Sequence, residues 1–170
     1  ALALFAGSRD RITPHQRGLY LSAARSEIFN RILAERVRRS NWNVAIHGDV
    51  FMFPDSRSFF KPDEIAEDTT QRMASKAIHP SGVLWGKTPS TASDDALAIE
   101  NTIAADMPEF CAGLAQFDVE TARRPFRLCP ENMVWDFTEP GELRLSFTLP
   151  AGAFATVVVR ELADTGSLDN

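Results

Sequence analysis

The hydrophobic residues of this chain change their spacing near Asp118, and this change limits the folds that the chain can adopt. Before Asp118, apolar side chains recur every three or four residues, which is the period of a helix that buries one face. In "LRLSFTL" (143–149) they alternate instead: leucine and phenylalanine take one side, and arginine, serine and threonine the other. A chain with helices first and antiparallel strands later is expected to be of the α+β class.

The first third of the chain predicts a loop followed by a long helix. Residues 1–18 hold glycines and a proline in a polar setting and are expected to form a loop or linker. From about 19 to 39 the apolar positions share one helical face: Leu21, Ala24, Ile28, Phe29, Ile32 and Leu33.

The middle third predicts a hairpin and further helices. Val50–Phe53 and Ser58–Phe60 flank a Pro-Asp-Ser turn, a pattern typical of a β-hairpin. Pro62 and the acids after it are expected to open a helix that runs to about Ala77. The stretch from 79 to 93 is predicted to be a loop. Beyond it, helices are expected from 93 onward and again from Pro108.

The last third predicts an antiparallel meander over 119–149, covered by a C-terminal helix. The segment "PAGAFATVVVREL" (150–162) contains three valines in a row, which favours a strand. Neither strand face would be cleanly apolar, however. A helix starting near Gly152 gives one unbroken apolar stripe, made of Ala155, Val158, Val159 and Leu162. Phe154 lies off this stripe, at the first turn.

Composition is that of an ordinary globular protein, with 44% hydrophobic and 24% charged residues and a net charge of -5. The sequence has no apolar run that could span a bilayer and no signal peptide, so a cytoplasmic protein is expected. Cys111 and Cys129 are too isolated for a disulfide framework and are expected to be reduced thiols. The three histidines lack metal-ligand spacing, and no metal site is predicted.

Basic residues concentrate near the start of the sequence, where residues 1–42 contain eight arginines and no lysine. Arg9 and Arg11 belong to this group, and Arg123 and Arg124 precede a predicted strand. Clustered arginines can contact the phosphates of a nucleic acid. They can equally form a solvated surface, and charge alone does not decide between the two.

Five stretches together resemble one family, in this order and at these spacings: "LSAARSEIFNRILAERV" (21–37), "GDV" (48–50), "IHPSGVLWG" (78–86), "ALAIE" (96–100) and "LPAGAFATVVVREL" (149–162). They resemble the TruD family of tRNA pseudouridine synthases. The resemblance runs from about Arg9 to Glu161. It implies an enzyme that isomerises uridine-13 in the D-arm of tRNA to pseudouridine, with no cofactor and no metal.

The resemblance also implies a domain organisation. Residues 1–120 would form most of the family's inserted domain, residues 121–166 the C-terminal part of the catalytic domain, and residues 167–170 a tail. The family's nucleophilic aspartate lies in an N-terminal signature that this sequence lacks, and the flanks of Asp10 do not match it. We therefore expect no catalytic residue in this chain, and expect the N-terminal half of the same protein and tRNA to be its partners.

The resemblance places Phe154 at the catalytic cleft, where an aromatic ring can stack on the target base. The alternative for Phe154 is a purely structural role at the edge of the sheet. Arg25 and Asn30 match family positions at which hydrogen bonding inside the inserted domain is expected. The alternative function for the whole chain is a non-catalytic RNA-binding or structural module.

Overall fold

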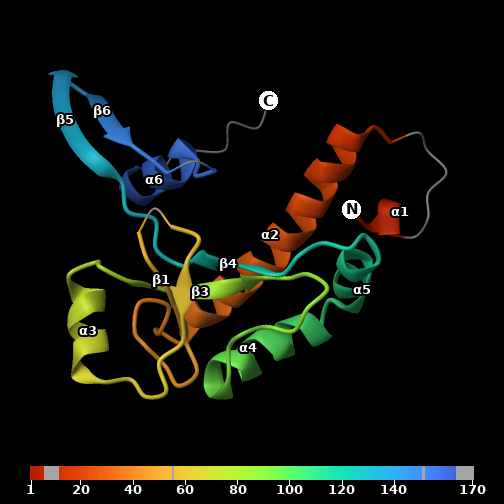
Figure 1. Cartoon of the computed structure of the whole chain (residues 1–170). Helices are drawn as coiled ribbons and strands as arrows, with labels where there is room; N and C mark the ends of the chain where they lie inside the picture. The colour runs from red at the N-terminus through yellow and green to blue at the C-terminus, as the bar shows by residue number, and fades with distance from the viewer. Residues whose placement is uncertain (6–11, 55, 151, 164–170) are drawn as a thin grey trace. The chain divides into compact units, whose positions relative to one another are not determined.

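The longest helix, α2 (Pro14–Arg38), packs against an antiparallel sheet in the larger of two units (Figure 1). The structure is a computed structural model that describes residues 1–5, 12–54, 56–150 and 152–163. The two units are Ala1–Arg127 and Leu128–Asn170, and each is described by itself. Helices and antiparallel strands occur in both, which confirms the predicted α+β class.

Helix α2 begins at Pro14, earlier than predicted, because its first turn is marked by capping residues and not by apolar spacing. The Thr13 hydroxyl accepts a hydrogen bond from the Gln16 amide at 3.2 Å, and the Gln16 side chain accepts one from the Thr13 amide at 2.9 Å. This is a capping box, with proline at the first helical position. A short helix, α1 (Leu2–Phe5), comes before it, so part of the expected loop is helical.

The sheet of the larger unit has the strand order β2-β1-β3-β4, with every pair antiparallel. Its strands are β1 (Val50–Met52), β2 (Phe59–Phe60), β3 (His79–Leu84) and β4 (Ala122–Pro125). The predicted hairpin is confirmed as the β1–β2 pair. The prediction of a loop at 79–84 was wrong. Strand β3 is almost entirely buried, so its residues do not alternate between apolar and polar.

Three further helices belong to this unit: α3 (Glu67–Ala74), α4 (Asp94–Ala105) and α5 (Pro108–Gln116). Helix α3 starts later than predicted, with Glu67 and Asp68, and not the acids after Pro62, in its first turn. Helices α4 and α5 are confirmed. Ser93 takes the N-cap position of α4 but makes no side-chain cap hydrogen bond. Its hydroxyl instead accepts one from Lys61 at 3.2 Å.

The core lies where α2 meets the sheet and helices α4 and α5. It consists of Ala24, Ile28, Phe29, Ile32, Val83, Ile99, Met107, Leu114 and Phe126. Glycine is required at position 82 of β3, since a Cβ there would lie 2.6 Å from the Phe126 ring and 3.2 Å from the Phe29 ring. In the part of the chain that the structure describes, no helix is long and apolar enough to cross a membrane.

The smaller unit contains strands β5 (Glu131–Glu139) and β6 (Glu142–Thr148) and helix α6 (Ala155–Leu162). The predicted C-terminal helix is confirmed. The prediction that the "RRPFRLC" strand belongs to the same meander was wrong: β4 pairs with β3, from Ser81–Pro125 to Leu84–Ala122. Trp135 and Phe137 pair with Leu145 and Leu143 on one hairpin face, yet they are 64% and 71% exposed.

Candidate nucleic-acid interface

Phe154 is the most exposed large apolar side chain in the described residues, at 72%. The chain turns just before it, where the Ala153 amide donates to the Pro150 carbonyl at 3.1 Å. Gly152 has a φ of +88° in this turn, a left-handed conformation that favours glycine, although a Cβ there would meet no other atom. The turn leads into α6 and leaves the Phe154 ring in solvent.

The position of Phe154 is poor for helix stability. It is the N-cap of α6, in extended conformation, and makes no side-chain cap hydrogen bond. Serine, threonine, asparagine or aspartate would satisfy a free amide there and stabilise the helix by about 1 kcal/mol. An exposed aromatic ring at a position where it costs helix stability is more easily explained by binding than by folding.

Arg123 lies in a buried ion pair. Its guanidinium donates to the Glu100 carboxylate at 2.8 Å and to the Ser81 hydroxyl and carbonyl at 2.8 and 2.7 Å. The side chains of Arg123 and Glu100 are only 2% and 3% exposed. Arg123 therefore links β4 to β3 and α4. Its side chain is too deeply buried to contact RNA.

Arg124, the next residue, lies on the opposite face of β4. Its guanidinium lies over the Phe29 ring, 5.1 Å from the ring centroid. Burial lowers its pKa. Arg9 and Arg11, the other two predicted RNA contacts, fall outside the described residues, as does Asp10.

The described residues contain no set of three or more His, Cys, Asp or Glu side chains that could hold a metal ion. Both cysteines are free thiols, and burial raises the pKa of Cys111, which disfavours its nucleophilic thiolate form. The sequence predicts no catalytic residue here. The Ser90 hydroxyl does donate to the Glu100 carboxylate, but that carboxylate is already paired with Arg123.

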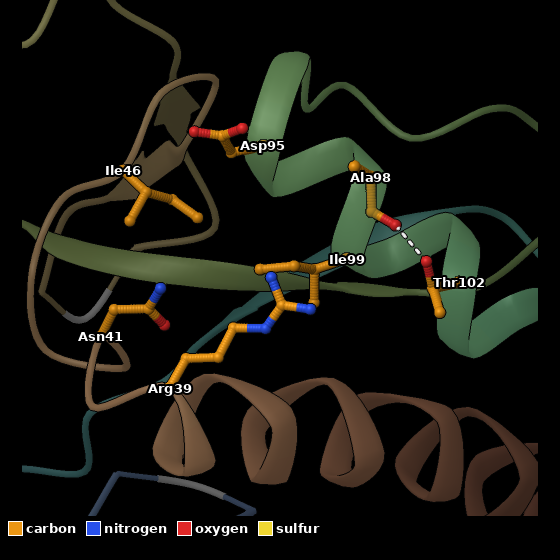
Figure 2. A pocket seen from close by; sticks show the side chains of 7 residues that line it. All are labelled: Arg39, Asn41, Ile46, Asp95, Ala98, Ile99 and Thr102. Atoms are coloured by element: carbon orange, nitrogen blue, oxygen red, sulfur yellow. Dashed lines mark hydrogen bonds between the residues drawn. The ribbon is translucent and has the colours of Figure 1, made fainter.

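A hollow of about 320 Å³ lies between the end of α2, the loop after it and α4 (Figure 2). Its wall includes Arg39, Asn41 and Thr102. The Arg39 guanidinium already pairs with Glu35 at 2.6 Å, and the Thr102 hydroxyl donates to the Ala98 carbonyl at 2.8 Å. Two of its polar groups thus have partners within the protein.

Comparison with known families agrees with the resemblance noted in the sequence. The family model for tRNA pseudouridine synthase D (TruD) matches residues 4–162. The chain belongs to the TruD family. The match includes both units, so the hairpin and α6 belong to the same family segment as the larger unit.

Curated TruD relatives are similar in sequence but longer. A tRNA pseudouridine synthase D from Methylococcus capsulatus is 46% identical over 164 residues, which cover 96% of this chain and 46% of that protein. One from Hydrogenovibrio crunogenus is 40% identical over 162 residues, which cover 95% of this chain and 46% of that protein. The chain therefore spans under half the length of these relatives.

A solved TruD structure from Methanosarcina mazei shares the fold, with a TM-score of 0.58 and 24% sequence identity. The match covers 81% of this chain and 36% of that one. The structure agrees with the expected hydrogen bonding of Arg25, which donates to the Leu84 and Glu120 carbonyls at 3.2 and 2.9 Å. The sequence did not reveal that the Arg124 guanidinium lies over the Phe29 ring, because the two residues are far apart along the chain.

Proposed function

We propose that this chain is the C-terminal part of a tRNA pseudouridine synthase that isomerises uridine-13 in the D-arm of tRNA. The observation that carries the proposal is the TruD family match over residues 4–162. The reaction breaks the bond between ribose C1′ and uracil N1 and forms a bond from C1′ to C5. The C5 proton leaves and N1 gains one, so atoms and electrons balance within uridine, and we propose no cofactor or metal.

In this proposal the nucleophilic aspartate comes from a segment outside this chain. Support comes from the length of the relatives, of which the chain spans 46% in both of the examples above. The N-terminal segment of the same protein is therefore the proposed protein partner, and tRNA the proposed substrate.

Phe154 is the residue that we propose contacts the substrate. Its ring is exposed, and it occupies the N-cap of α6 without a side-chain cap hydrogen bond. A base that stacks on such a ring gains about 1–3 kcal/mol in single-stranded nucleic-acid sites. Stacking would hold uracil, once its bond to the sugar is broken, while it turns to present C5.

We also propose how the units correspond to the family's domains. The larger unit would supply most of the inserted domain, and the β5–β6 hairpin and α6 the C-terminal part of the catalytic domain. The division after Arg127 and the pairing of β4 with β3 support a boundary somewhat later than the predicted one at 120.

The test measures the release of tritium from tRNA labelled at uridine C5, since that hydrogen leaves only when C5 bonds to the sugar. We expect no release by this chain alone, and release when the N-terminal segment is supplied as part of the longer gene product. Turnover by residues 1–170 alone would contradict the assignment of the nucleophile. A longer product that binds tRNA tightly without turnover would instead favour a non-catalytic RNA-binding module.

A further inference from the structure

Two arginines of the larger unit, Arg25 and Arg124, form no ion pair with a carboxylate of the described residues. Arg25 belongs to α2 and Arg124 to β4, and the Arg124 guanidinium lies over the ring of Phe29, one helical turn after Arg25 on α2. Burial lowers the pKa of Arg25, and the positive charge of Arg124 lowers it further. Two like charges near each other in a half-buried setting destabilise the folded protein unless an anion offsets them.

The Arg25 guanidinium makes two hydrogen bonds to the backbone, but one of its nitrogens has no hydrogen-bond partner in the described part of the chain. One terminal nitrogen donates to two backbone carbonyls, of Leu84 and Glu120. Its Nε is buried and has no hydrogen-bond partner among the described residues. Buried donors of this kind are rare, and each one calls for an explanation such as a ligand or a water molecule.

The Arg124 guanidinium stacks on a buried aromatic ring, that of Phe29. The Phe29 ring beneath it is buried and packs against Phe126, with ring centroids 5.7 Å apart. Gly82, which pairs with Arg124 across the sheet, leaves room for both rings. Arg124 makes no hydrogen bond or ion pair within the described part of the chain, so its five donor hydrogens remain available.

Several neighbouring basic residues, unlike Arg25 and Arg124, are paired with carboxylates. On α2 itself, Arg31 pairs with Glu27, and Arg36 with Asp49. Arg123 pairs with Glu100. The Glu120 carboxylate, next to the carbonyl that Arg25 contacts, pairs with Lys87 at 2.6 Å. The Glu27, Asp49, Glu100 and Glu120 carboxylates are thus each paired with another cation.

One further arginine of α2 has no carboxylate partner among the described residues. Arg17 lies eight residues before Arg25, which is about 12 Å along a helix axis. Its guanidinium lies over the Phe117 ring at 6.0 Å, and no described carboxylate pairs with it. A row of arginines supported by aromatic rings suits a chain of phosphates better than a single free anion.

We propose that Arg25 and Arg124 bind a backbone phosphate of the tRNA substrate, so that the larger unit positions the RNA without reading its sequence. This inference rests on the proposed function for its ligand. A guanidinium group can donate two parallel hydrogen bonds to the oxygens of one phosphate. Such contacts contribute to affinity and orientation but carry no base specificity.

The test compares tRNA binding by residues 1–170 carrying Arg124→Gln with binding by the same chain carrying Arg31→Gln. Both changes remove one positive charge, but Arg31 lies in an exposed pair with Glu27. Fluorescence anisotropy across a salt series measures affinity and its salt dependence. We expect Arg124→Gln to weaken binding roughly three- to tenfold and to reduce the salt slope by about 0.7–0.9, the value for one lost phosphate contact. Arg31→Gln should leave the slope unchanged.

Arg124→Lys keeps the charge and serves as the rescue variant, and melting temperatures confirm that each variant is folded. Equal salt slopes for folded Arg124→Gln and Arg31→Gln would overturn the proposal. So would a loss of stabilisation by inorganic phosphate without any change in tRNA affinity, which would indicate a free-anion site. Tritium release by the longer gene product is measured separately. If the longer gene product releases no tritium, the proposed function is rejected. The anisotropy measurement would still decide whether Arg25 and Arg124 bind RNA.

Discussion

Phe154 is exposed at the N-cap of α6, and the proposed contact with the substrate can be tested separately from its effect on folding. Because its ring is exposed and cannot cap α6, Phe154→Ser should leave stability unchanged or raise it by up to about 1 kcal/mol. In the longer gene product, the same change should lower the rate of tritium release roughly 5- to 150-fold, the equivalent of one lost stacking contact. Urea denaturation and the release assay measure the two effects. A destabilised Phe154→Ser with normal activity would assign Phe154 to the fold.

Arg123 and Glu100 show the opposite case, in which charged residues support the fold. Arg123→Ala would leave the buried Glu100 carboxylate without its cation, although Ser90 and the Val83 amide still donate to it. We expect a loss of about 3–5 kcal/mol in the free energy of unfolding, measured in urea. The matched control is Arg31→Ala, which breaks an exposed pair and should cost under about 1 kcal/mol. Similar losses for the two variants would contradict this.

Helix α6 allows a test with two adjacent valines. Val158 is 8% exposed and Val157 is 47% exposed. Val158→Asp would bury a charge without a partner and should unfold the smaller unit, seen as a lower melting temperature and faster proteolysis after Arg127. Val157→Asp makes the same substitution at the neighbouring, exposed position and should have little effect on the melting temperature. If both variants melt like the parent chain, α6 does not hold the unit together.

The elements differ in how well their sequences predict them, for physical reasons. Helices α2, α4 and α5 bury one face, so their spacing identifies them, and α6 was recognised by its apolar stripe despite three valines. Strand β3 was missed because it is buried along its length. The partner of β4 was also predicted wrongly, since local alternation shows that a segment is a strand but not which strand it joins. The contact of the Arg124 guanidinium with the Phe29 ring depends on the same long-range pairing.

At the scale of the whole molecule, the smaller unit stands out for the apolar side chains that its sheet leaves exposed. The β5–β6 hairpin has two strands, and a two-stranded sheet is marginally stable in water. One of its faces carries Trp135, Phe137 and Leu143, all of them exposed. Exposed apolar faces of this kind mark surfaces that pack against another part of a protein. The relatives contain a further segment of more than half their length, and in the proposed function that segment is the partner.

We therefore expect the apolar hairpin face to bind the N-terminal segment of the same protein. Phe137→Ser should weaken the association of separately expressed segments by roughly 10- to 100-fold, because burying a phenylalanine contributes about 1.5–3 kcal/mol. Val44→Ser is the control, since Val44 is 57% exposed but lies in the larger unit. Co-purification and calorimetry measure the association. If Phe137→Ser and Val44→Ser bind the N-terminal segment equally well, the hairpin face is not the contact, and the two segments must associate through other surfaces.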